Sequence, residues 1–154
     1  MKKWIKIIIA ILICQLAGAI GSIFTMSSIP TWYATLNKPW FSPPNWVFGP
    51  VWVTLFTLMG ISLYFVWDKG AKNVRTPLTI FGIQLVLNVV WSFLFFGLLS
   101  PFYGFIEIIL LWIAILATII SFYKVSKKAA YLLIPYIVWV SIAASLNYFI
   151  LVLN

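Results

Sequence analysis

The side chains that could do chemistry in this sequence are mainly indoles and amides, because most conventional catalytic groups are absent. The 154 residues include no histidine, one cysteine and two acids. These acids are Asp68 and Glu107. Such a set cannot build a catalytic triad, a pair of catalytic carboxylates or an ordinary metal site. The nine tryptophans remain as the unusual resource, and their large flat rings are suited to packing against flat apolar molecules.

One apolar segment combines these indoles with amides. Gln84, Asn88 and Trp91 follow one another at helical spacing, so they share one face of a helix. Amides in hydrocarbon need hydrogen-bond partners, and two interpretations stay open: bonds to neighbouring helices, or contact with a ligand.

Two further segments carry similar faces. Trp139, Ala143 and Asn147 lie four residues apart in one of them, and Trp52 and Phe56 share a face in the other. Any single aromatic stripe would be ordinary packing core. Three stripes that also carry amides or small residues predict a shared pocket.

A loop rich in tryptophan and proline precedes Trp52. The stretch TWYATLNKPWFSPPNWVFGPVW contains four tryptophans and four prolines. Proline fixes backbone angles, so we expect this segment to be stiff. Its apolar underside would comprise Trp32, Tyr33, Trp40, Phe41 and Trp46. The pattern predicts a lid on the outer mouth of the pocket, and the alternative is an aromatic belt in the lipid headgroups.

The composition places these segments in a membrane. The chain is 64% hydrophobic and 8% charged, which is too little polar surface for a soluble fold. Five apolar runs are long enough to cross a bilayer, and they lack the alternation typical of barrel strands. We therefore predict an all-α membrane protein, a single transmembrane domain with five transmembrane helices and a structured first loop. The predicted spans are 4–26, 46–67, 77–99, 103–124 and 129–150, with the lid loop at about 27–45.

Basic residues predict the orientation. With five spans, nine of the ten cations fall on one side and only Lys38 falls opposite. The positive-inside rule then puts the N terminus in the cytoplasm and the first loop and C terminus outside. The net charge of +8 follows from topology, and no nucleic-acid partner is expected.

The N-terminal segment also has features of a cleavable signal sequence, with a basic start and Ala17-Gly18-Ala19. We predict a retained span, because its apolar character continues through Phe24. Cys14, Gly18 and Ser22 form a small-residue face that lets helices approach closely.

Glu107 lies inside the fourth predicted span. A charged carboxyl at that depth is costly, so we expect it to be protonated, paired or facing a wet interior. An acid within a membrane is a functional candidate, and the alternative is a neutral acid bonded to a neighbouring helix.

Short motifs along the whole chain resemble the translocator protein family, also called tryptophan-rich sensory proteins or peripheral-type benzodiazepine receptors. The motifs are Trp32-Tyr33, Lys38-Pro39-Trp40, Ser42-Pro43-Pro44, Val51-Trp52, Leu87-Asn88 followed by Trp91, Leu133-Ile134-Pro135-Tyr136 with Trp139, and Leu146-Asn147-Tyr148. The resemblance implies a five-helix bundle, commonly dimeric, whose pocket is capped by the first loop. It also implies ligands such as protoporphyrin IX, haem and synthetic isoquinolines or benzodiazepines, with membrane lipid as surroundings and a homodimer as the expected assembly.

Matched residue by residue, the family's ligand pocket falls on Tyr33, Pro43, Trp46, Trp52, Phe56, Asn88, Trp91, Trp139 and Ala143. Helical periodicity adds Gln84. Light-dependent porphyrin degradation has been attributed to bacterial members, and Trp52 and Trp139 match the tryptophans implicated, so they are the catalytic candidates. No cofactor is expected to be required, and porphyrin or haem would be the ligand. The family's proposed cholesterol motif is incomplete, because no lysine or arginine follows Tyr148.

Three functions follow as hypotheses for a protein of the bacterial cell membrane. The leading one is a receptor or sensor for tetrapyrroles. The second is a photo-oxidase that uses bound porphyrin as sensitiser, and the third is a transporter of tetrapyrroles or other lipophilic molecules.

Overall fold

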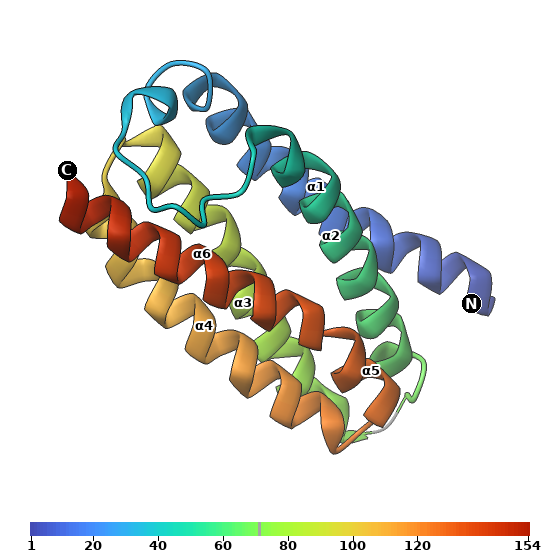
Figure 1. Ribbon diagram of the computed structural model, residues 1–154. Helices are drawn as coiled ribbons and strands as arrows, with labels where there is room; N and C mark the ends of the chain where they lie inside the picture. The colour runs from blue at the N-terminus through green and yellow to red at the C-terminus, as the bar shows by residue number, and fades with distance from the viewer. Residues whose placement is uncertain (71) are drawn as a thin grey trace.

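The fold is a bundle of five apolar helices that are each long enough to cross a membrane. A computed structural model describes residues 1–70 and 72–154. Figure 1 shows the helices running alongside one another, with the first loop at the end of the bundle that holds the C terminus. In the described residues every regular element is helical, which confirms the predicted fold class.

The helices match the predicted spans to within three residues at each end. The first two spans are α1 (Lys3–Ser28) and α2 (Asn45–Trp67). The third is α3 (Arg75–Ser92), which continues into a π-helical turn, η3 (Phe93–Gly97). The fourth is α4 (Pro101–Tyr123), and the fifth is divided into α5 (Lys127–Leu132) and α6 (Ile134–Leu153). Two 3-10 turns, η1 (Tyr33–Thr35) and η2 (Lys72–Val74), lie in the loops.

Local sequence explains where the later helices begin. Ser100 caps α4 by accepting a hydrogen bond from the backbone N–H of Tyr103 at 3.2 Å, and Pro101 occupies the first turn, where a missing N–H does no harm. Ser126 caps α5 by accepting from the backbone N–H of Ala129 at 3.3 Å. Pro135 interrupts the last span because it cannot donate a helical hydrogen bond, so α6 restarts at Ile134.

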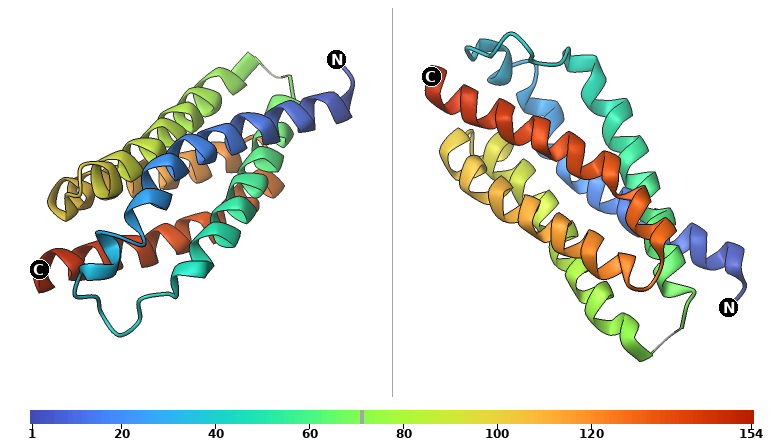
Figure 2. Two further views of the ribbon diagram at one scale, coloured as in Figure 1. Left: turned by 90° about the horizontal axis from the view of Figure 1, so that it is seen from above. Right: turned by 60° about the horizontal axis from the view of Figure 1, so that its bottom comes forward.

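The packing of α1 against α2 is uneven along their length. A methyl group built on Gly60 would lie 2.5 Å from the Cα atom of Ile11, so the two backbones touch there. Nearer the first loop the helices part, as the two views of Figure 2 show. The other main contacts join α3 to α4, α4 to α6, and α1 to α3.

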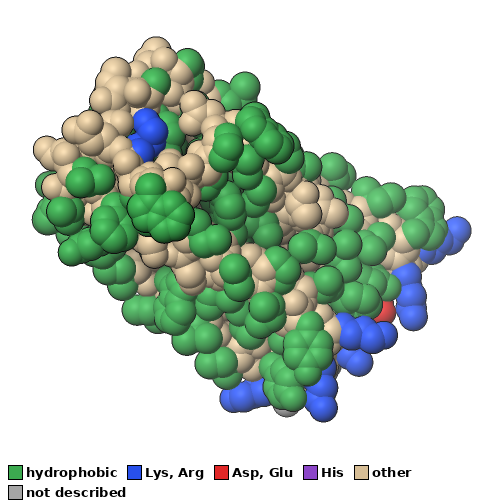
Figure 3. Space-filling model, in the orientation of Figure 1, with side chains coloured by type: hydrophobic (Ala, Val, Ile, Leu, Met, Phe, Trp, Pro, Cys, Tyr) green, Lys and Arg blue, Asp and Glu red, His purple; other side chains and the backbone are tan. Residues whose placement is uncertain are grey.

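The charges gather at the end of the bundle that holds the N terminus. Figure 3 shows lysine and arginine clustered there, and one further cation at the opposite end. Asp68 forms ion pairs with Lys6 at 3.4 Å and Lys3 at 3.9 Å, which ties the end of α2 to the start of α1. The separation of charge matches the predicted topology, while the assignment of this end to the cytoplasm remains a prediction.

The first loop (residues 29–44) turns only some of its aromatic rings inward. Tyr33 is 1% exposed and packs edge-on against Phe48. Burial raises the pKa of its phenol, and the hydrogen bond with Ser42 acts in the opposite direction. Trp40 is 95% exposed and Trp46 is 74% exposed. The expected apolar underside is therefore wrong for these two tryptophans. Trp40 packs against Phe41, whose ring meets Phe149 of α6 in its place, and Trp46 already belongs to α2.

The close approach at Gly60 predicts a large effect from one added methyl group. Gly60→Ala should lower the midpoint temperature of unfolding in detergent, since overpacking costs about 1–3 kcal/mol. Gly82→Ala is the matched control, because a methyl group there meets no atom within 4 Å. Equal stability of the two variants would contradict the backbone contact.

Candidate functional site

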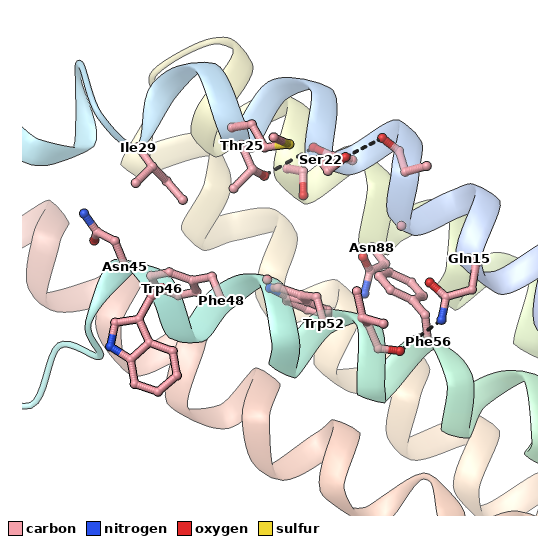
Figure 4. A pocket seen from close by; sticks show the side chains of 17 residues that line it. Gln15, Ser22, Thr25, Ile29, Asn45, Trp46, Phe48, Trp52, Phe56 and Asn88 are labelled. Atoms are coloured by element: carbon pink, nitrogen blue, oxygen red, sulfur yellow. Dashed lines mark hydrogen bonds between the residues drawn. The ribbon is translucent and has the colours of Figure 1, made fainter.

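A cavity lies between α1 and α2 in the half of the bundle nearest the first loop (Figure 4). Its volume is about 550 Å³, within the range of roughly 300–1,000 Å³ that is typical of small-molecule pockets. We call it the outer cavity. It is lined by Gln15, Gly18, Ala19, Gly21, Ser22, Thr25, Met26, Ile29, Asn45, Trp46, Phe48, Gly49, Trp52, Val53, Phe56, Asn88 and Ser92.

The α1 wall of the outer cavity is built from small and hydroxyl side chains. Ser22 and Thr25 project from α1 toward α2 in Figure 4. A methyl group built on Gly18 would lie 2.6 Å from the ring of Phe56, so glycine lets this ring lie against the α1 backbone. The sequence interpretation assigned Cys14, Gly18 and Ser22 to one helix-packing face. In the structure Cys14 is buried, whereas Gly18 and Ser22 line the cavity.

The α2 wall is aromatic and separates the outer cavity from a smaller chamber. Trp52 and Phe48 line both spaces. The inner chamber measures about 20 Å³, which is room for about one water molecule. Trp139 lines it, and the buried Nε1 of this indole has no hydrogen-bond partner among the described residues. A donor without an acceptor beside a small void is a group that a ligand could satisfy.

A chain of three buried polar side chains forms the floor beneath the outer cavity. The Asn88 Nδ2 donates to the Tyr136 hydroxyl at 2.8 Å, and that hydroxyl donates to the Gln84 Oε1 at 2.7 Å. Gln84 is 1% exposed, so its amide serves helix association. Asn88 also lines the cavity. Both amides thus bond to a neighbouring helix, and contact with a ligand stays a prediction for Asn88, the one of the two that borders the cavity.

A second polar link holds the aromatic wall of the inner chamber. The Trp91 Nε1 donates to the Asn147 Oδ1 at 3.0 Å, and the Asn147 Nδ2 donates to the backbone carbonyl of Pro101 at 2.8 Å. These bonds join α3, α4 and α6. The π-helical turn that follows widens the helix and turns Phe95 and Phe96 inward, where both line the chamber.

Comparison with known proteins agrees with the arrangement of helices and tryptophans. The sequence model of the TspO/MBR family matches residues 10–153. The chain belongs to the TspO/MBR family. It is 46% identical over 150 residues to "Tryptophan-rich protein TspO" of Archaeoglobus fulgidus, which covers 97% of each chain. It is 39% identical over 132 residues to "Translocator protein" of Homo sapiens, covering 84% of this chain and 78% of that one. It is 32% identical over 123 residues to "Tryptophan-rich sensory protein" of Cereibacter sphaeroides, covering 80% and 77%.

The predicted site residues of this TspO/MBR family protein fall into three groups. Those that line the outer cavity are Trp46, Trp52, Phe56 and Asn88. Those that line the inner chamber are Tyr33, Trp52, Trp91, Trp139 and Ala143. Gln84 and Pro43 line neither space, since the amide of Gln84 is bonded to Tyr136 within the bundle and Pro43 lies in the loop.

Sequence reasoning missed much of the α1 wall. Gln15 and Thr25 line the outer cavity, yet neither belongs to an aromatic stripe. Two signals could have found them: the many small and hydroxyl residues between 17 and 28 for Thr25, and the single amide within an apolar span for Gln15.

Glu107 lies on α4, away from both spaces. It is 6% exposed, and neither carboxyl oxygen has a hydrogen-bond partner among the described residues. The described part of the chain contains no group of three histidine, cysteine or acidic residues that could hold a metal ion.

The polar chain beneath the cavity predicts the effect of one lost hydroxyl. Tyr136→Phe removes the acceptor of Asn88 and the donor to Gln84, so it should lower the unfolding midpoint, with a cost of about 1–3 kcal/mol for stranded buried groups. Tyr131→Phe is the matched control, because Tyr131 is 60% exposed. An unchanged midpoint in Tyr136→Phe would show that the chain of bonds contributes nothing to stability.

Proposed function

We propose that this membrane protein is a receptor or sensor that binds flat hydrophobic tetrapyrroles, such as protoporphyrin IX, in the outer cavity. The observation that carries the proposal is a cavity of about 550 Å³ with an aromatic wall on α2 and a small-residue wall on α1. The relatives named translocator protein and tryptophan-rich sensory protein support a sensing or transport role at the membrane.

The shape of the cavity supports a planar ligand. The ring centroids of Trp52 and Phe56 lie 5.6 Å apart with an angle of 31° between the ring planes, and both rings line the cavity. The facing wall of Ala19, Gly21 and Ser22 has side chains too short to fill the space. A thin, wide molecule fits between such walls better than a branched one.

The polar groups of the cavity support a ligand with polar groups at its edge. Ser22, Thr25, Asn45 and Asn88 each bring a hydroxyl or amide to the lining. The sequence has no histidine, so haem would lack its commonest protein ligand for the iron. We therefore expect free porphyrin to compete well with its iron form.

Binding can be tested by titrating protoporphyrin IX and following tryptophan fluorescence. We expect Trp52→Phe combined with Trp139→Phe to weaken binding by about tenfold or more, or roughly 1.4 kcal/mol, because Trp52 lines the outer cavity and Trp139 lines the inner chamber behind it. Trp4→Phe is the control, since Trp4 is 59% exposed near the N terminus. Wild-type affinity in the double variant would count against the proposed site.

Light-driven degradation of bound porphyrin is a second candidate activity. It is favoured by the buried Nε1 of Trp139, which has no hydrogen-bond partner in the part of the chain that the structure describes, and by the position of Trp52 between the two spaces. Pigment and oxygen would supply the chemistry, and the protein would supply position. Illumination of the Trp52→Phe and Trp139→Phe double variant with bound porphyrin tests this role. Flux of labelled porphyrin into proteoliposomes tests the alternative function, which is transport.

We also propose that the basic end of the bundle faces the cytoplasm, as the positive-inside rule predicts. A cysteine introduced as Asn154→Cys in a Cys14→Ala background should react with a membrane-impermeant maleimide added outside intact cells. Lys2→Cys in the same background is the control and should stay unlabelled until the cells are opened. The reverse pattern would invert the topology.

A further inference from the structure

We infer that ligands reach the outer cavity sideways from the bilayer, through the gap between α1 and α2, and not from water beneath the first loop. The inference depends on the proposed function for the identity of its ligand. Its geometry is independent of that identity.

The rim of the outer cavity is exposed where the membrane would surround it. Met26 on α1 is 72% exposed, and Trp46 and Val53 on α2 are 74% and 58% exposed. All three line the cavity, and Met26 and Val53 lie within apolar helices long enough to span the hydrocarbon. The opening therefore faces acyl chains.

The end of the gap farther from the first loop is closed by the side-chain amide of one residue, Gln15. The Gln15 Nε2 donates to the backbone carbonyl of Val53 at 3.0 Å and to the Thr57 Oγ1 at 2.8 Å. Beyond it, Ile11 and Gly60 bring the helix backbones into contact. Gln15 therefore joins α1 to α2 at this end of the gap and limits the length of the opening.

The first loop is packed down over the inner chamber, away from the outer cavity. Tyr33 is almost fully buried, and Trp32 packs edge-on against Phe95 at 5.5 Å. The backbone N–H of Asn37 donates to the Asn154 Oδ1 at 3.1 Å, and the Asn154 Nδ2 donates to the carbonyl of Asn37 at 2.9 Å. These bonds tie the middle of the loop to the end of α6.

A ligand-free test uses bilayers whose acyl chains carry bromine, which quenches tryptophan emission on contact. The contribution of Trp52 is the difference between wild type and Trp52→Phe. We expect this contribution to be quenched, and to be protected by Gly49→Leu, because Gly49 lines the cavity and has open space at its Cβ position. Gly82→Leu, also in open space but on α3, should leave the quenching unchanged. Trp52 emission that bromine does not reach would overturn the inference, whatever the protein binds.

A kinetic test follows protoporphyrin IX dissolved in the same bilayers. Gly49 is exposed and lies between Trp46 and Val53 on the cavity-lining face of α2, so a side chain there would narrow the portal. It should slow association and dissociation alike, and we expect Gly49→Leu to lower both rate constants by about tenfold. A side chain that only takes up binding volume would raise the dissociation rate.

Asn154→Ala, which removes the hydrogen bonds between the loop and α6, should leave both rates within about twofold of wild type. Faster exchange in Asn154→Ala with unchanged rates in Gly49→Leu would place access beneath the loop. A wild-type protein that binds no porphyrin would refute the proposed function, and the quenching result would still decide the portal.

Discussion

The backbone contact between α1 and α2 at Gly60 is the constraint on which the cavity depends. Two helices that touch at one end and are joined by a loop of sixteen residues (29–44) at the other can part between these points. Close approach requires a residue without a side chain, because any Cβ at Gly60 would collide with Ile11. Membrane helices gain little from apolar burial against one another, so such fitted contacts determine where they meet and where they diverge.

Hydrogen bonds between α3 and α6 keep the opposite wall in place while the α1–α2 gap remains open. Tyr136 joins two amides of α3, and Asn147 joins Trp91 to the start of α4. In hydrocarbon each of these polar groups would be costly without its partner. No water is available in hydrocarbon to replace these hydrogen bonds. The bond to Tyr136 therefore holds the side chain of Asn88 in a fixed position at the cavity.

The two spaces on either side of Trp52 differ in what they can do. The outer cavity has the volume for a small molecule, and the inner chamber has barely the volume of a water. A ligand in the outer cavity would lie against Trp52, and it could meet the free N–H of Trp139 only if the aromatic partition moved. The first loop covers the inner chamber through Tyr33, so the loop and the outer cavity are less directly connected than the sequence pattern indicated.

Much of this architecture was predictable from the chain alone, because lipid imposes simple rules. Apolar runs had to become helices, the cations had to share one side, and Trp52, Phe56 and Asn88 were placed at the cavity by helical spacing and family resemblance. Which residues of a helix face line the cavity, and which bond only to a neighbouring helix, was not predictable. Gln84 and Asn88 are the same kind of group one turn apart, yet only Asn88 reaches the cavity. The α1 wall around Ser22 likewise depends on how far α1 and α2 diverge. That divergence follows from contacts between residues distant in sequence, such as Ile11 with Gly60, which no local pattern encodes.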